Sequence, residues 1–269
     1  MIKTLVPLLL LLIEINQCFA QGRISRDSMT ALLKKAPAFT IYNDNYFLTG
    51  ANLNQRINSD NADAKFQISF KQRLTSLMLP LKTYLFLTYT QKSFWDIYKF
   101  SSPFSETNYN AGIGIARPIF KNDVLIGALA LKVDHESNGR DSIESRSWNF
   151  ISLNYQSGIT AKTSFMIQIW CPYRVANKNL ISYIGYGEAR LRYIVRADKL
   201  IVDLIGRKGA VGWNGNLSTS LSFRPFKFSN QYLTVQWWQG HAENLIRYQE
   251  YTSKVRLGLT IKPIHSIFY

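Results

Sequence analysis

Cysteine is scarce in this sequence: only Cys18 and Cys171 occur among its 269 residues. Cys18 lies near the end of the N-terminal stretch "MIKTLVPLLLLLIEINQCFA", in which a lysine precedes an apolar run at residues 5–13. This order is typical of a secretory signal peptide, and we expect residues 1–20 to be removed. A lipoprotein signal ending at Cys18 is disfavoured because Gln17 before it is not small. With one cysteine left after export, the mature chain cannot be a disulfide-stabilised scaffold.

Long apolar runs, helical heptads, internal repeats and linkers are absent after residue 20. The run at residues 5–13 is itself too short to span a bilayer. The sequence therefore predicts no transmembrane helix, and we expect residues 21–269 to form one domain.

Acidic residues are also few: the sequence has 17 Asp and Glu against 32 Lys and Arg, which gives a formal net charge of +15. A basic balance favours an anionic partner such as nucleic acid or a surface rich in phosphate head groups. The basic residues are not concentrated in any run, so we expect no nucleic-acid partner.

Alternation of apolar and polar residues is what the sequence has in abundance, and it predicts strands of an antiparallel sheet. A secreted soluble β domain would also have one polar face. The number of segments, the signal peptide, the aromatic residues at segment ends and the final Ile267–Tyr269 favour a twelve-stranded antiparallel transmembrane β-barrel in the outer membrane. The predicted strands are Phe39–Gly50, Ala64–Leu74, Tyr84–Gln91, Asn108–Ala116, Val124–Ser137, Ser147–Ser157, Ser164–Trp170, Gly187–Arg196, Lys199–Gly206, Asn216–Arg224, Tyr232–Trp238 and Lys254–Lys262.

One of only three histidines lies at the end of such a strand, in "KVDHESNGRDSIESRSWNF". Along Val124–Ser137, every second residue up to Val133 is apolar or glycine, and His135 and Ser137 continue that column. The charged residues between them belong to the other column. Because successive side chains of a strand point to opposite faces, His135 and Ser137 are expected on the lipid-facing surface.

Asn149 heads the apolar column of the next predicted strand. If the two strands pair through the connection between them, His135 and Asn149 lie opposite each other, with their Cβ atoms about 5 Å apart. The amide oxygen can then accept the Nδ1 proton, and the ring can reach Ser137, which supplies nucleophile, base and orienting residue. The alternative is that these are ordinary polar residues at strand ends, as we interpret His241 and His265 to be ordinary barrel or loop residues.

The motif "DHESNGRDSIESRSWN", with "YTQKSFW" and "SSPFSETNY" upstream, resembles outer-membrane phospholipase A, the calcium-dependent barrel enzyme of Gram-negative envelopes. The resemblance is strong over about Tyr89–Asn149. It implies an A1/A2-type phospholipase that releases fatty acid and lysophospholipid. Ser137 would then be the nucleophile, His135 the general base and acid, and Asn149 the residue that orients the histidine. The alternative function is a catalytically silent barrel, either a porin or a scaffold.

The resemblance also implies a calcium ion and an active homodimer. The matching calcium ligands are Arg140, through its backbone carbonyl, and Ser145, while Ser101 matches a ligand from the neighbouring subunit. Oxygen ligands suit this hard cation. Gln91 matches a glutamine at the dimer interface. Phe94 stands where the family often has tryptophan, which we expect to alter the packing of acyl chains.

Overall fold

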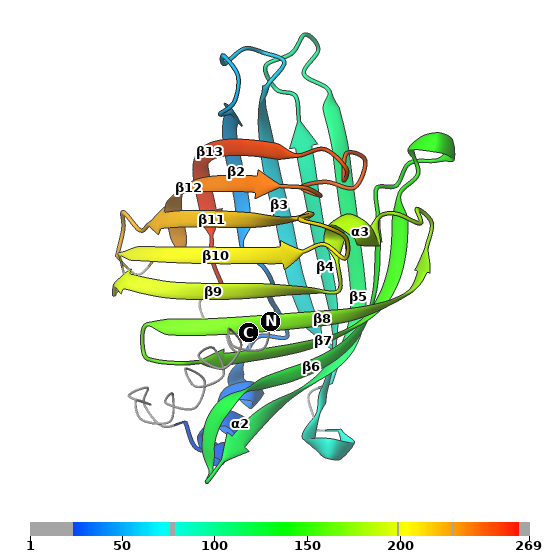
Figure 1. Cartoon of the computed structure of the whole chain (residues 1–269). Helices are drawn as coiled ribbons and strands as arrows, with labels where there is room; N and C mark the ends of the chain where they lie inside the picture. Colours follow the sequence, from blue (N-terminus) through cyan, green and yellow to red (C-terminus); the bar gives the residue numbers. More distant parts are fainter. Residues whose placement is uncertain (1–23, 76–78, 198, 228, 264–269) are drawn as a thin grey trace, which may run out of the picture.

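The chain folds as one closed sheet, seen in a computed structural model that describes residues 24–75, 79–197, 199–227 and 229–263 (Figure 1). Pairing of β3 with β4 closes the sheet into the predicted twelve-stranded antiparallel barrel, whose first strand consists of β1 and β2. The predicted signal peptide, Ile267–Tyr269 and His265 lie outside the described residues. The strands are β1 (Phe39–Ile41), β2 (Asn45–Asn52), β3 (Ala62–Arg73), β4 (Tyr84–Trp95), β5 (Phe104–Lys121), β6 (Val124–Ser137), β7 (Ser147–Gly158), β8 (Thr163–Val175), β9 (Gly187–Arg196), β10 (Leu200–Lys208), β11 (Gly215–Phe223), β12 (Gln231–Gly240) and β13 (Thr252–Ile261).

The first barrel strand is interrupted, and the prediction of one continuous strand over Phe39–Gly50 was wrong in this respect. Both β1 and β2 pair with β3, but the chain leaves the ladder between them. There the backbone N–H of Asn43 donates to the Ser69 hydroxyl (3.1 Å). The break lets the consecutive residues Tyr42, Asn43 and Asp44 all line the barrel interior. A regular strand would have turned the middle one outward.

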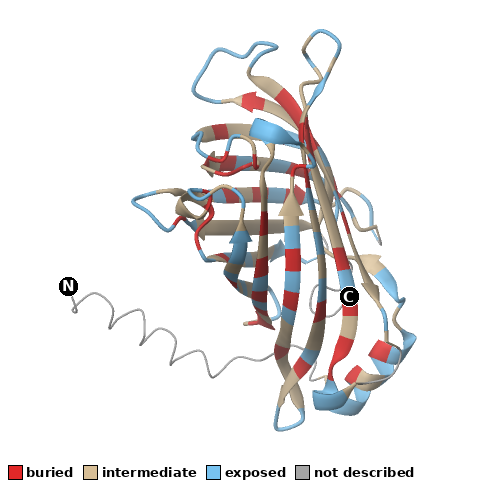
Figure 2. Ribbon diagram, turned by 90° about the vertical axis from the view of Figure 1, so that its right-hand side faces the viewer, coloured by how far each residue is buried: buried red, intermediate tan, exposed pale blue. Residues whose placement is uncertain are grey.

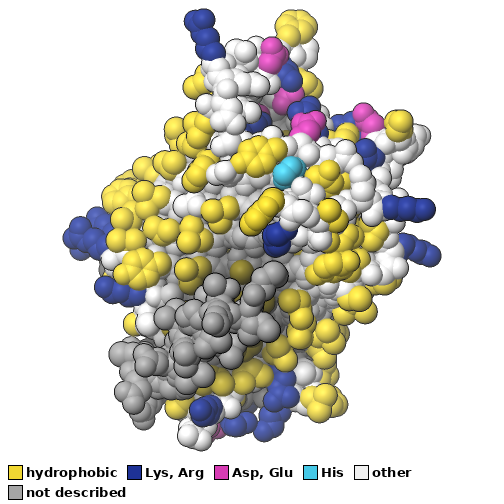
Figure 3. All heavy atoms as spheres, in the orientation of Figure 1, with side chains coloured by type: hydrophobic (Ala, Val, Ile, Leu, Met, Phe, Trp, Pro, Cys, Tyr) yellow, Lys and Arg dark blue, Asp and Glu magenta, His cyan; other side chains and the backbone are white. Residues whose placement is uncertain are grey.

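The barrel wall is apolar outside and charged inside. On β6, Leu131 and Val133 are 46% and 45% exposed, whereas Lys132 and Asp134 are buried and form an ion pair (Nζ to Oδ1, 2.8 Å). Figure 2 shows the same banding along the strands, and Figure 3 shows hydrophobic side chains over the middle of one face, with most basic side chains toward its margins. This is the arrangement of a barrel surrounded by lipid.

Within the described part of the chain, no helix is both long and apolar enough to cross a membrane.

The two ends of the barrel differ. The connection after each even-numbered strand lies at one end, which we call the loop end. The remaining connections, the start of β1 and the end of β13 lie at the other, the turn end. At the loop end, the connection at 176–186, which contains α3 (Ile181–Ile184), and the connection at 241–251 pack onto inward-facing residues of β7 and β8. These buried residues, the loop-end core, are Trp148, Phe150, Trp170, Leu180, Ile184, Ala242, Leu245 and Tyr248.

The turn end carries the helix α2 (Arg26–Lys35), opposite α3 (Figure 1). Ser25 caps its first turn, because the hydroxyl accepts the backbone N–H of Ser28 (3.2 Å). Met29 and Leu33, spaced one turn apart, are buried against Tyr84 of β4. The helix is therefore anchored to the barrel by its apolar side.

Candidate functional site

The outer surface near the loop end carries a histidine–asparagine pair. The register of β6 and β7 sets His135 directly opposite Asn149, and the His135 Nδ1 and Asn149 Oδ1 atoms are 2.9 Å apart. The amide oxygen only accepts, so Nδ1 carries the proton and donates it. Nε2 is then left as an acceptor. His135 is exposed, and a histidine side chain is visible at the upper edge of the apolar area in Figure 3.

Ser137 lies on the same face of β6, two residues beyond His135, opposite Ser147 of β7 and Tyr109 of β5. Residues two apart on a strand are separated by about 6.5 Å along the backbone, so the imidazole ring can extend toward the serine. Among the described residues, no hydrogen bond joins the Ser137 hydroxyl to His135. Such bonds are often loose without substrate, and within the described ranges no other hydrogen bond uses Nε2.

Two hydrogen bonds on the inner face hold the strand pair that carries these residues. The Glu136 carboxylate accepts from the Trp148 indole (2.9 Å), and the Asp134 carboxylate accepts from the Ser152 hydroxyl (2.9 Å). They flank the His135–Asn149 row on either side. The sequence predicted that Glu136 points inward, but it gave no sign of the indole partner, which depends on the strand register.

The connection from β6 to β7 is tied together by a buried asparagine. Asn138 donates its backbone N–H to the Arg146 carbonyl (3.0 Å) and its side-chain amide to the Glu144 carbonyl (2.8 Å). Gly139 has φ +66°, and a Cβ there would lie 3.0 Å from the Tyr109 ring. Glycine is needed here because it adopts a positive φ without strain and because a side chain would crowd the Tyr109 ring. The loop beside Ser137 thus has a defined shape, and sequence reasoning had not singled out Asn138.

The predicted calcium ligands lie on two loops of the loop end. The Arg140 guanidinium is held by the Glu144 carboxylate and by the Ser105 carbonyl (2.6 Å). In the described chain, no hydrogen bond uses the Arg140 carbonyl or the Ser145 hydroxyl, so both oxygens are available to a cation. Ser101 is exposed on the connection between β4 and β5 and has φ +62°. This set of oxygens fits a hard ion.

No group of three His, Cys, Asp or Glu side chains is placed to hold a metal ion among the residues that the structure describes. A cation at the β6–β7 connection would therefore depend on carbonyl and hydroxyl oxygens, completed by water or by a second subunit.

Gln91 lies on the outer face of β4, within a line of polar groups. Its side chain accepts from the Tyr89 hydroxyl (3.0 Å) and donates to Ser93 (3.2 Å), whose hydroxyl lies 3.0 Å from that of Thr107. Phe94 faces the other way and is only 2% exposed. It packs inside the barrel, so our expectation that it alters the packing of acyl chains was wrong.

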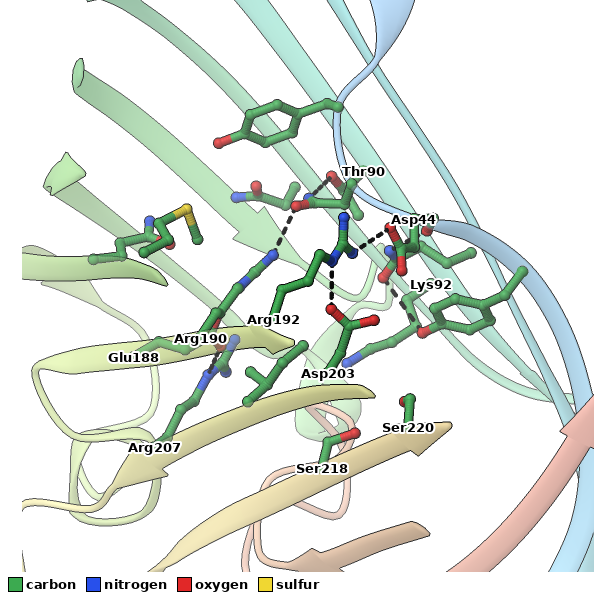
Figure 4. A pocket seen from close by; sticks show the side chains of 18 of the residues that line it. Asp44, Thr90, Lys92, Glu188, Arg190, Arg192, Asp203, Arg207, Ser218 and Ser220 are labelled. Atoms are coloured by element: carbon green, nitrogen blue, oxygen red, sulfur yellow. Dashed lines mark hydrogen bonds and ion pairs between the residues drawn. The ribbon is translucent and has the colours of Figure 1, made fainter. Parts of the chain in front are cut away.

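The barrel interior contains a cavity of about 350 Å³ that does not include the histidine, serine or asparagine described above. Ion pairs join its walls: Arg192 bonds Asp203 on the neighbouring strand (2.6 Å) and also reaches across the interior to Asp44 (3.3 Å) (Figure 4). Residues of the loop-end core line it at one end. Side chains that bridge the interior in this way favour a filled, rigid barrel over an open pore.

The fold thus defines a membrane-embedded β-barrel that carries a polar site on its outer wall. The Phospholipase A1 family model matches residues 28–261, and the chain belongs to this family. A protein of Neisseria meningitidis serogroup B is 27% identical over 220 residues, covering 77% of this chain. Phospholipase A1 of Proteus vulgaris is 28% identical over 223 residues, also covering 77% of this chain. The match spans 56% of the Neisseria protein and 73% of the Proteus protein.

Solved structures share the fold. The Salmonella typhi outer membrane phospholipase dimer with bound calcium superposes with a TM-score of 0.76 at 22% identity, over 91% of this chain and 100% of that chain. An active-site mutant of Escherichia coli outer membrane phospholipase A, with asparagine changed to alanine, gives 0.75 at 22% identity, over 88% and 98%. The protein is thus an outer-membrane, multi-pass β-barrel.

Proposed function

We propose that this protein is a calcium-dependent phospholipase of the A1/A2 type that hydrolyses the acyl esters of membrane phospholipids. The observation that carries the proposal is the hydrogen bond between His135 and Asn149 on a surface that faces lipid, with Ser137 two residues further along. Family membership supports the reaction class. The active-site asparagine of the E. coli relative supports the role of Asn149.

The arrangement can perform acyl transfer on a lipid that lies against the barrel wall. The Ser137 Oγ attacks the ester carbonyl while Nε2 of His135 takes its proton, and Asn149 holds the ring through Nδ1–H. The bond to the glycerol oxygen then breaks, and His135 protonates that oxygen, which releases lysophospholipid. Water, activated by the same Nε2, hydrolyses the acyl–serine ester and releases the fatty acid. No pocket is needed, because the surrounding lipid is the substrate.

Calcium would be held by the Arg140 carbonyl and the Ser145 hydroxyl, with Ser101 of a second subunit as a further ligand. When bound, the ion supplies positive charge near the ester oxygen. The charge matters because the asparagine, unlike a carboxylate, adds none of its own to the site. A ligand from a second subunit would make activity depend on dimerisation, which is a sensible control for an enzyme that degrades its own membrane.

We expect fatty-acid release from phospholipid–detergent micelles to require calcium and to stop when a chelator is added. Ser145→Ala should raise the calcium concentration needed for half-maximal activity by about tenfold, the effect of losing one oxygen ligand. Ser142→Ala, a hydroxyl removed from the same connection, is the matched control. Undiminished release in chelator would contradict the role of calcium, and no release from a folded, dimeric barrel would favour the silent barrel instead.

Gln91→Ala is expected to weaken dimerisation, since the outward-facing amide of β4 can no longer bond to a second subunit. Sedimentation in detergent with calcium should show a larger monomer fraction, and activity should fall in parallel. Gln231→Ala, exposed at the start of β12, should change neither quantity. Full calcium-dependent turnover by a strictly monomeric preparation would contradict the proposed dimer control.

A further inference from the structure

The row of outward-facing residues that contains His135 and Asn149 continues onto β8. Asn149 pairs with Arg174, and the register then shifts, so that Phe150 pairs with Pro172 and Tyr173 bulges out. Directly opposed residues lie on the same face of a sheet. The next pair faces the opposite way, because Trp148 belongs to the loop-end core and Val175 packs against that core, on the inner side. Arg174 therefore points outward, and it is exposed.

Unlike the other arginines near the site, Arg174 has no partner of its own among the residues that the structure describes. The Arg140 guanidinium is held by Glu144 and the Ser105 carbonyl, and that of Arg146 donates to the carbonyls of Ile143 and Ser145. For Arg174, neither an ion pair nor a hydrogen bond of the side chain occurs within the described ranges. It is thus a cation left free beside the site.

Its distance from the site suits one phospholipid molecule. Neighbouring strands are about 4.8 Å apart, so the backbone of Arg174 lies about 5 Å from that of Asn149 and about 10 Å from that of His135. The glycerol backbone alone separates the ester from the phosphate in such a lipid, and a long arginine side chain can cover the remaining distance. A guanidinium matches two phosphate oxygens in a bidentate contact.

The position in the barrel agrees with this contact. An arginine on the lipid face is costly at the membrane midplane and tolerated near the interfaces, where the phosphates lie. Arg174 is the second-last residue of β8, at the loop end of that strand, and the exposed Tyr173 beside it is an aromatic residue of the type found at such interfaces.

We propose that Arg174 binds the phosphate group of the phospholipid whose ester is cleaved, and so makes the site select phosphate-bearing lipids over neutral esters. The cleavage part rests on the proposed function, whereas the binding part does not. Arg174 acts here as a specificity-determining residue.

The kinetic test compares hydrolysis of a phospholipid with that of a diacylglycerol bearing the same acyl chains, in the same micelles. For Arg174→Leu, the ratio of the two kcat/KM values should fall by about 10- to 100-fold, the loss of one charge-assisted contact. Arg174→Lys should recover part of the ratio, because lysine keeps the positive charge but cannot make the bidentate contact of a guanidinium. Lys178→Leu, an exposed cation four residues further on, should leave the ratio as in the wild type. An unchanged ratio in Arg174→Leu would overturn the proposal.

A binding measurement separates this proposal from the proposed function. Native mass spectrometry of the folded barrel in neutral detergent should show retention of phosphatidic acid in preference to diacylglycerol by the wild type, and loss of that preference in Arg174→Leu. If no preparation hydrolyses lipid but the preference still depends on Arg174, the phosphate contact stands and the phospholipase activity fails. If the preference is the same in Arg174→Leu as in the wild type, the proposal fails, whatever the activity.

Discussion

Ser137→Ala should reduce fatty-acid release by about 10⁴-fold or more, because the nucleophile is lost and histidine and asparagine alone cannot form the acyl–serine ester. The measurement is fatty acid released per folded barrel, from micelles with calcium. Ser147→Ala is the matched control, since Ser147 pairs directly with Ser137 across β6 and β7 and lies on the same face. An equal loss in the two variants would show that the effect comes from the strand surface and not from a nucleophile.

Asn149→Ala should cost less, about 10- to 100-fold, which is part of the 10²- to 10⁴-fold that a general base contributes. Its His135 partner loses the acceptor that fixes the tautomer, but the ring stays on the same strand. Asn149→Asp restores an acceptor and should recover most of the activity. If Asn149→Ala left activity unchanged, the hydrogen bond seen in the structure would have no part in catalysis.

The faces of the strands could be predicted because side-chain direction in a strand follows a period of two, which is a local property. That period alone placed His135, Ser137 and Asn149 outward, and the structure has all three on that face. The period of two failed at residues 42–44, where contacts with distant strands stabilise the irregular backbone. The position of Arg174 could not be predicted either, because a bulge on β8 changes the register just before it.

Residues on connections follow no such period. The sequence pattern by itself would have chosen none of Ser101, Arg140 and Ser145, and only the resemblance to a family pointed to them. The buried Asn138, which shapes the connection next to Ser137, could in principle have been suspected from the Asn-Gly pair it forms, since such pairs favour turns. Ion pairs inside the barrel, such as that of Lys65 with Glu243, join residues 178 positions apart and leave no local signal.

A buried charge cluster under the loop end should dominate the stability of the barrel. Arg256 is 1% exposed, and its guanidinium bonds the carboxylates of Asp63 (2.6 and 2.8 Å) and Glu243 (2.6 and 3.2 Å). Arg256→Met would leave these carboxylates buried with less positive charge, at a cost of about 3–5 kcal/mol in the free energy of unfolding. Urea unfolding of the barrel in detergent, followed by tryptophan fluorescence, measures it. Lys254→Met, which removes a more exposed partner of Asp63, should cost less.

The pH dependence of the barrel's stability should report the contribution of Glu243 to this cluster. Glu243 lies in the connection between β12 and β13. Burial by itself would raise the pKa of Glu243, but the adjacent Arg256 and Lys65 cations hold that pKa below its ordinary value. The unfolded chain then takes up a proton at higher pH than the folded one, so the stabilisation is complete above about pH 4.3 and declines as the pH falls toward the folded-state pKa. Glu243→Gln should therefore lower the urea midpoint at pH 7 and reduce its fall in acid. An acid limb as steep as that of the wild type would assign the pH dependence to other carboxylates and leave Arg256 stabilised chiefly by Asp63.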